Sequence, residues 1–236
     1  MTPATPLRLP LAQVLFSQGF GTRRQCAALI AAGQVQIGGL TVDDPRAVVP
    51  TDGLVFVVAG QPWSYRARAL VLLHKPLGYE CSTKPRHHPS VLALLPAPLR
   101  ERGVQPVGRL DADTTGLLLL TDDGTLIHRL TSPKHHVAKV YEVTCKHDLA
   151  PDTVARLLAG VVLDDDPRPV RASACEAISE RQLRLTLTEG RYHQVKRMVA
   201  AAGNRVQALH RSAIGAWTLP ADLPPGAWCW ADPAGD

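Results

Sequence analysis

Cysteine and long apolar segments are both scarce in this sequence. Its five cysteines are scattered along the chain, and none of them belongs to a C-x-x-C pair or has the spacing of a zinc knuckle. This pattern argues against a structural zinc site and is typical of buried thiols in a reducing compartment. No apolar run approaches the roughly 20 residues that cross a bilayer, and the first residues lack the basic-then-apolar order of a signal peptide. We therefore expect a cytoplasmic protein.

A strong excess of charge of one sign is also absent. The 236 residues include 26 Lys and Arg against 21 Asp and Glu, which gives a net charge of +5, and 45% of the residues are hydrophobic. This composition is that of a folded protein, and the length suits either one large domain or a small domain with a medium one. A net charge of this size says little about the partner, so function has to be inferred from local motifs.

The N-terminal part of the chain begins with the signals of a short helix. Thr22 and Gln25 have the spacing of a capping box, which predicts that a helix begins directly after Thr22. Gly33 stands where a glycine ends such a helix. Arg23 and Arg24 fall in its first turn, where the helix dipole disfavours a cation. Either a phosphate backbone binds these two arginines or they are simply solvated.

Short strands are predicted after this helix. Gly38 and Gly39 supply the two-residue turn of a hairpin, and residues 54–58 form a further apolar strand. Residues 61–68 mix polar and apolar side chains around a proline, so we expect them to be a linker.

The segment over residues 1–62 resembles the S4 family of RNA-binding domains. The family pattern is matched by the following residues: Gly19, Thr22, Arg23, Arg24, Ile30, Gly33, Val35 and Gly39. The resemblance implies a small α/β module in which Arg23 and Arg24 contact RNA.

A tight loop before a buried strand is the first candidate for chemistry. Residues 117–120 are four consecutive leucines and predict a fully buried strand, and residues 108–116 before them are rich in Gly and Thr. A loop docked on a core strand is a rigid mount for a reactive side chain. Asp111 and Asp113 are the only acidic residues in this loop, and either one could instead be an ordinary turn residue.

Alternating and helical patterns follow. Residues 139–143 and 182–187 alternate like strands with one buried face, and Tyr141 shares a face with Lys139. Residues 195–203 have the period of an amphipathic helix. The segment at the beginning of that helix is dense in cationic and titratable residues, namely Arg191, His193, Lys196 and Arg197.

Together these segments resemble the RsuA branch of the pseudouridine synthases. The matching motifs, in chain order, are Lys-Pro-x-Gly at 75–78, Gly-Arg-Leu-Asp at 108–111, Ser-Pro-Lys at 132–134, Lys-x-Tyr at 139–141 and Glu-Gly-Arg-Tyr-His-Gln-Val-Lys-Arg-Met at 189–198. The resemblance implies an α+β protein: the S4-like module, then a pseudouridine synthase catalytic domain over residues 69–236, built on a mixed, mainly antiparallel sheet. Within the branch the small-subunit (16S) ribosomal RNA enzyme is the better match, and an enzyme that modifies large-subunit (23S) RNA is the alternative.

The resemblance also implies a reaction, in which the base of a uridine leaves C1′ through N1 and returns through C5. No atom enters or leaves, so no cofactor and no metal are expected. The resemblance places the required carboxylate at Asp111, whereas spacing alone leaves Asp113 as a competitor. A carboxylate in a closed pocket needs a neighbouring cation to stay ionised. The motif gives Lys196 for that role, with Arg197 as the alternative, and Tyr141 as an aromatic face for the flipped base.

Other cations are candidates for RNA contacts. The resemblance makes these residues candidates: Arg109, Lys134, Arg191 and Arg197. The expected partner is ribosomal RNA, as 16S RNA or within a small-subunit assembly intermediate, and a monomer is expected. Two other classes remain open on the sequence, namely a catalytically silent RNA-binding or ribosome-assembly factor and a magnesium-dependent nucleotide hydrolase.

Overall fold

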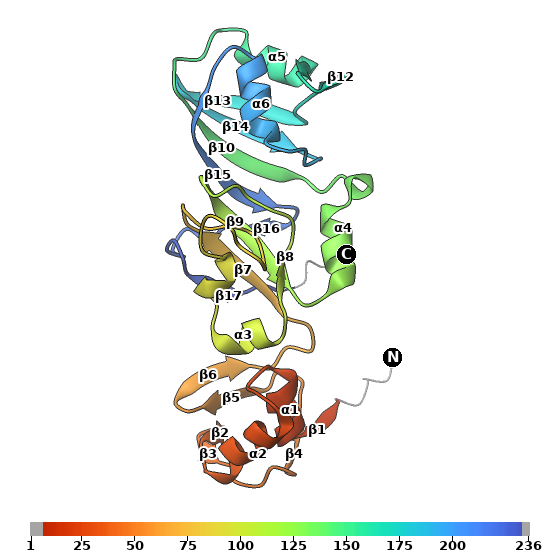
Figure 1. Cartoon of the computed structure of the whole chain (residues 1–236), viewed down its shortest axis with the longest axis vertical. Coiled ribbons are helices and arrows are strands. Elements are labelled where there is room, and N and C mark those ends of the chain that lie inside the picture. The colour runs from red at the N-terminus through yellow and green to blue at the C-terminus, as the bar shows by residue number, and fades with distance from the viewer. Residues whose placement is uncertain (1–6, 233–236) are drawn as a thin grey trace. The chain divides into compact units, whose positions relative to one another are not determined.

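The computed structural model describes residues 7–232, which form two compact units. One unit comprises the described residues up to Ala69 together with Leu95–Val104, and the other comprises Leu70–Leu94 and the described residues from Gln105 onward (Figure 1). No helix in this described range is long and apolar enough to span a membrane.

The segment Leu95–Val104 belongs to the N-terminal unit, although the sequence analysis places it in a domain over residues 69–236. Hydrogen bonds from Arg102 join this segment to the N-terminal unit. Its Nη1 donates to Oε1 of Gln18 at 2.8 Å and to the carbonyl of Arg66 at 2.9 Å. A side chain that joins distant segments in this way leaves no local signal in the sequence.

The N-terminal unit combines short helices and short strands. Its elements are α1 (Leu11–Ser17), α2 (Arg23–Ala31), α3 (Ala97–Glu101), β1 (Arg8–Pro10), β2 (Val35–Ile37), β3 (Leu40–Thr41), β4 (Val48–Pro50), β5 (Val55–Val58) and β6 (Gln61–Ser64). Strand β1 pairs with β4, and a separate antiparallel sheet has the order β3-β2-β5-β6.

The local signals for α2 and the following hairpin are confirmed. Thr22 and Gln25 form both bonds of the capping box: the Gln25 N–H donates to the Thr22 hydroxyl, and the Thr22 N–H donates to the Gln25 side chain. Gly33 follows the helix with a φ of +68°. Gly38 and Gly39 both have positive φ and join β2 to β3, as a two-residue hairpin requires.

The prediction of a linker over residues 61–68 is wrong for its first half, because Gln61–Ser64 is strand β6. Pro62 argues against a strand in the sequence, since proline has no N–H for a sheet ladder. Strand β6 lies at the edge of its sheet, where one side of the backbone has no partner strand. Trp63 is buried from this strand and packs edge-on against Phe20.

The second unit is built on a large sheet. Its elements are β7 (Leu70–Lys75), β8 (Gln105–Pro106), β9 (Thr114–Thr121), α4 (Gly124–Thr131), β10 (Lys139–Cys145), α5 (Thr153–Ala159), β11 (Val161–Leu163), β12 (Asp166–Val170), β13 (Ala174–Ser179), β14 (Gln182–Leu187), α6 (Gln194–Ala201), β15 (Val206–Ile214), β16 (Trp217–Thr218) and β17 (Trp228–Trp230). Short 3-10 turns lie at Val91–Leu94 and Pro133–His135.

The large sheet has the order β13-β14-β10-β15-β9-β7-β17, with β16 on β15 and β8 on β9. Among these pairs β15 and β9 run parallel and the others antiparallel. The prediction of a mixed, mainly antiparallel sheet is therefore confirmed.

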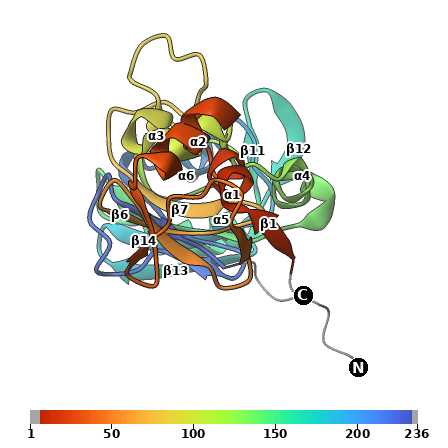
Figure 2. The ribbon, with the colours of Figure 1, turned by 90° about the horizontal axis from the view of Figure 1, so that it is seen from below.

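Burial follows the sequence patterns. The four leucines 117–120 are fully buried in β9, and the alternating leucines of β14 point into the core. Helices α5 and α6 cover one face of the part of the sheet formed by β13, β14 and β10 (Figures 1 and 2), where Leu157, Met198 and Leu185 share one hydrophobic cluster. This packing fixes the N-terminal end of α6 close to the sheet.

Candidate active site

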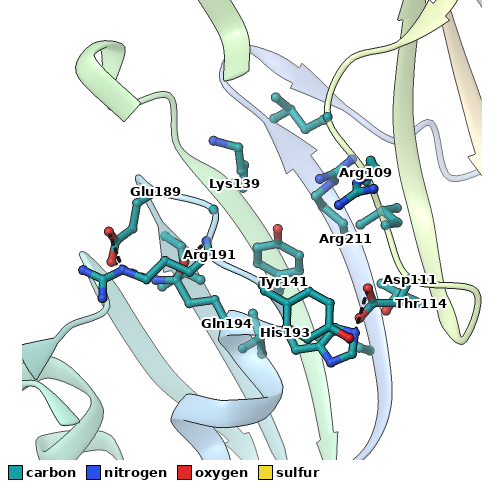
Figure 3. A pocket seen from close by; sticks show the side chains of 18 of the residues that line it. Arg109, Asp111, Thr114, Lys139, Tyr141, Glu189, Arg191, His193, Gln194 and Arg211 are labelled. Atoms are coloured by element: carbon teal, nitrogen blue, oxygen red, sulfur yellow. Dashed lines mark hydrogen bonds and ion pairs between the residues drawn. The ribbon is translucent and has the colours of Figure 1, made fainter. Parts of the chain in front are cut away.

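A cavity of about 350 Å³ lies in the second unit (Figure 3). Its lining comes from the loop before β9 and the first residue of that strand, the end of α4, strands β10, β14 and β15, the segment 189–193 and the first turn of α6. The volume suits a small ligand such as a nucleobase.

Lys75 anchors the loop that carries Asp111 by hydrogen bonds to its backbone. This lysine is 0% exposed, and its Nζ donates to the carbonyls of Pro76, Ala112 and Thr114 at 3.1, 3.4 and 2.7 Å. Burial lowers the pKa of Lys75. The N–H of Gly78 also donates to the Ala112 carbonyl at 2.8 Å. Two ends of the Lys-Pro-x-Gly motif therefore hold the loop in place.

Asp111 faces the cavity and is held by two side chains from the beginning of α6. Its Oδ2 lies 2.9 Å from Nζ of Lys196, and its Oδ1 lies 3.3 Å from Nε2 of His193. The Asp111 side chain is 33% exposed. The predicted partnership of Asp111 and Lys196 is thus present in the geometry, 85 residues apart in sequence.

Asp113 lies outside the cavity, beside the same lysine. Its Oδ1 is 2.7 Å from Lys196 Nζ, but the side chain is 71% exposed and is not part of the cavity lining. The bond from Lys196 is the main cause that lowers the pKa of Asp113. Burial alone would lower the pKa of Lys196, but the bonds to Asp113 and Asp111 outweigh it and raise that pKa.

His193 was not assigned a role from the sequence. It precedes α6 in the left-handed conformation, with a φ of +48°, which is uncommon for a non-glycine residue and is concentrated at functional sites. Its ring stacks on Tyr192 with centroids 3.8 Å apart. In the sequence, only the density of cationic and titratable residues at the beginning of this helix pointed to His193. Residue spacing could not show that its side chain contacts Asp111.

Tyr141 lies on β10 directly opposite Arg211 on β15, and both side chains line the cavity. A β-bulge on β15 puts Arg211 opposite Tyr141. Val140 pairs with Ala213 and the next residue, Tyr141, pairs with Arg211, so Ser212 is left without a partner in the register. A bulge moves the side chains beyond it to the opposite face. Arg211 was missed from the sequence because an alternating strand pattern does not reveal a bulge.

Gly116 permits the close approach of β9 and β15. It pairs with Arg211 at a φ of +108°, and a Cβ added to it would lie 2.2 Å from the Arg211 carbonyl oxygen. The Nε of Arg211 donates to the Leu117 carbonyl at 2.9 Å. The glycine therefore sets the position of a cavity-lining arginine.

The residues predicted to contact RNA are not all in one place. Arg109 and Arg191 line the cavity, and Arg191 pairs with Glu189 at 3.3 Å. Arg197 lines an adjoining groove and pairs with Asp165.

The remaining three lie elsewhere. Lys134 is exposed on the 3-10 turn Pro133–His135 and lines neither hollow. Arg23 and Arg24 are exposed on α2 in the other unit, where the Arg23 guanidinium lies 4.7 Å above the Phe16 ring. Of the site residues predicted from the sequence, those that line the cavity are Asp111, Tyr141, Lys196, Arg109 and Arg191.

The arrangement suits chemistry on a planar base. A carboxylate with two nitrogen-bearing side chains beside it and an aromatic ring line one cavity, which is large enough for a nucleobase. Such a carboxylate can act as a nucleophile. No group of three His, Cys, Asp or Glu side chains within residues 7–232 has an arrangement that could hold a metal ion.

Comparison with known proteins gives matches along most of the chain. The family model described as RNA pseudouridylate synthase matches residues 69–201, and the S4 domain model matches residues 9–53. Ribosomal small subunit pseudouridine synthase A of Escherichia coli K12 is 50% identical over 157 residues, which are 66% of this chain and 68% of that protein. The uncharacterized RNA pseudouridine synthase YtzG of Bacillus subtilis is 37% identical over 221 residues, or 92% of each chain.

A solved structure extends the likeness to three dimensions. A crystal structure of a pseudouridylate synthase, 34% identical in sequence, aligns with a TM-score of 0.67 over 95% of this chain and 96% of that one. Both resemblances seen in the sequence are therefore confirmed. The chain belongs to the RNA pseudouridylate synthase family and carries an S4 domain ahead of its catalytic part.

Proposed function

We propose that this protein converts one uridine of small-subunit (16S) ribosomal RNA to pseudouridine in the cytoplasm, with Asp111 as the catalytic carboxylate. The observation that carries the proposal is the position of Asp111, which lines the cavity with Tyr141 while Lys196 lies 2.9 Å from its Oδ2. The small-subunit substrate is inferred from the relatives at 50% identity, which are named for that activity.

The reaction requires one bond to break and one to form on the same two fragments. The C1′–N1 bond breaks, the base turns, C5 joins C1′, and the C5 proton is finally replaced by a proton on N1. Asp111 supplies the nucleophile, at C1′ or at C6, as its carboxylate. The bond that it forms breaks again: C5 displaces the carboxylate from C1′, or the carboxylate leaves C6 after C5 has joined C1′. The Lys196 ammonium lies 2.9 Å from Oδ2 and stabilises the negative charge of this carboxylate.

Tyr141 provides the platform for the flipped base. Stacking on an aromatic ring is worth about 1–3 kcal/mol per base, which is comparable with the few kcal/mol needed to extrude a nucleotide from a helix. Its hydroxyl group is also a candidate to accept the proton that leaves C5.

RNA contacts are assigned to cations around and beyond the cavity. Arg109 and Arg191 line the cavity and Arg197 lines the groove beside it, which supports their assignment to phosphates next to the flipped nucleotide. Lys134 is exposed and joins them as a contact to a more distant phosphate. Arg23 and Arg24 of the S4 domain bind structured RNA. This isomerisation adds and removes no atoms and changes no oxidation state, so it requires neither a cofactor nor a metal. A monomer suffices because residues of one chain line the cavity.

The test is to map pseudouridines in 16S and 23S RNA from cells that lack the gene. Reintroducing the wild-type gene should restore one pseudouridine in 16S RNA, and an Asp111→Asn copy should not. An Asp113→Asn copy is the matched control and should restore the site, since Asp113 is outside the cavity. Unchanged pseudouridines in the deletion strain, or restoration by Asp111→Asn, would refute the proposal.

A further inference from the structure

Arg211 is a buried cation that has no role in the reaction described above. Its side chain lines the cavity although the residue is only 3% exposed. Its Nε donates to the Leu117 carbonyl, but its Nη2 is buried and makes no hydrogen bond within the described residues. Within the same range no carboxylate forms an ion pair with it. A buried donor without an acceptor is unfavourable and needs an explanation.

The fold places this guanidinium in the cavity through two separate features. The bulge at Ser212 turns Arg211 to the face that holds Tyr141. Gly116 leaves room for the Arg211 backbone, where any Cβ would collide with it. If the only role of the side chain were its bond to the Leu117 carbonyl, neither the bulge nor the buried charge would be required.

The surroundings of Arg211 are positive. Lys139 lies two residues before Tyr141 on β10, and its Nζ donates to the Val137 carbonyl at 2.9 Å. Burial and then the charge of Arg211 lower the pKa of Lys139. In Figure 3 the Tyr141 hydroxyl points toward the end of the cavity that holds Lys139 and Arg211, whereas Asp111 and His193 lie toward the other end. The Asp111 carboxylate and the Arg211 guanidinium thus lie toward different ends of the cavity.

We propose that Arg211 binds a carbonyl oxygen of the flipped uracil and stabilises the negative charge that this base carries during the reaction. The inference rests on the proposed function and extends it to the leaving group. When the C1′–N1 bond breaks, its electron pair stays on N1 and spreads to O2 and O4. If Asp111 instead attacks C6, the displaced pair moves to C5 and O4. By either route the base becomes anionic until C5 bonds to C1′, and the C5 proton then leaves as N1 gains one.

A guanidinium that is fixed before the reaction is suited to this role. Donors that are already oriented toward developing charge in a site with little water stabilise the transition state strongly, because nothing has to reorganise. The bond from Nε to Leu117 and the packing between β9 and β10 fix the Arg211 side chain in this way. Arg211 would then be a catalytic residue that acts on the base, whereas Asp111 acts on the sugar or on C6.

The experiment uses the full-length protein and a synthetic RNA that carries the mapped target position as uridine or as 5-fluorouridine. Arg211→Met keeps an unbranched side chain without the charge, and Arg211→Lys keeps the charge without the planar donors. Arg109→Met is the matched control, because Arg109 also lines the cavity but is assigned to phosphate. The measurements are the dissociation constant for the RNA, the melting temperature, and the single-turnover loss of the starting nucleoside after digestion.

We expect Arg211→Met to slow the reaction of uridine by about 100-fold or more, while RNA affinity changes by less than about threefold. Fluorine withdraws electrons from the base and so performs part of the same stabilisation. The decrease in rate that Arg211→Met causes should therefore be at least several-fold smaller for 5-fluorouridine than for uridine. The rate of Arg211→Lys should lie between those of Arg211→Met and the wild type. Arg109→Met should weaken RNA binding and affect both bases equally.

Two results would overturn the proposal. One is a folded Arg211→Met protein that reacts with uridine at the wild-type rate. The other is an equal loss on uridine and 5-fluorouridine in both Arg211 variants, which would mark a structural role. Neither result touches the proposed function, because turnover of uridine by the wild type and its loss in Asp111→Asn are measured independently of Arg211.

Discussion

Lys196 and Asp111 form an ion pair across 85 residues of sequence, with Nζ and Oδ2 2.9 Å apart. The lysine comes from the first turn of α6, and the aspartate comes from the loop that Lys75 anchors directly before β9. The pair therefore forms only when the helix packs on the sheet. The proposed chemistry therefore depends on the packing of the core of the second unit.

Replacing Lys196 with Met should abolish most of the activity. The change removes the ammonium beside Asp111 and leaves only His193 Nε2, at 3.3 Å, as a partner. We expect kcat/KM to fall by about 100-fold or more, with Lys196→Arg partly active because it keeps a cation. Steady-state kinetics on the target RNA check this, and a Met variant within about threefold of the wild type would contradict it.

The bond between Lys196 and Asp113 should make stability depend on pH in acid. Because the pKa of Asp113 is lowered in the folded protein, the pair stabilises the fold above the ordinary pKa of 3.8. That contribution is lost as the pH falls through the lower, folded pKa. The side chain is largely exposed, so the effect is at most about 1 kcal/mol. The difference in melting temperature between wild type and Asp113→Asn should therefore shrink from about pH 7 to about pH 3, and a constant or growing difference would refute the assignment.

Gly116→Ala should destabilise the protein. The added Cβ would lie 2.2 Å from the Arg211 carbonyl oxygen, and the φ of +108° is itself unfavourable for alanine. We expect a loss of more than about 2 kcal/mol in the free energy of unfolding. Gly124→Ala is the control, because nothing lies within 4 Å of its added Cβ at the beginning of α4, and it should be neutral or slightly stabilising. Urea unfolding of both variants decides the comparison.

Arg23 and Arg24 should contribute to RNA affinity without affecting the chemical step. Replacing both with Gln should weaken binding and reduce the slope of log K against log salt by roughly 0.7–0.9 for each lost phosphate contact. Arg46→Gln in the same unit is the control, since Arg46 is exposed but stands outside the S4 motif. Unaltered affinity and slope in the double variant would mean that the two arginines are merely solvated.

Sequence patterns were sufficient where structure depends on neighbouring residues. The capping box at Thr22, the glycine hairpin and the leucines of β9 and β14 each follow from local propensity and burial. The motif resemblance likewise brought Asp111, Tyr141 and Lys196 together in advance.

What the sequence did not reveal depends on distant contacts. Strand β6 was missed because Pro62 is tolerated only at a sheet edge, and edges are set by strand order. Arg211 was missed because a bulge at Ser212 reverses the alternation. His193 reaches Asp111 from a left-handed backbone, and Arg102 joins segments that are far apart in sequence. None of these depends on a pattern of adjacent residues.

The most direct measurement is single-turnover formation of pseudouridine in the target RNA by purified wild-type and Asp111→Asn protein. We expect no detectable product from Asp111→Asn, with melting temperature and RNA affinity close to those of the wild type. Asp113→Asn should lose activity severalfold at most. Product formation by Asp111→Asn at more than about a tenth of the wild-type rate, a difference of under 1.4 kcal/mol in barrier, would contradict the central claim.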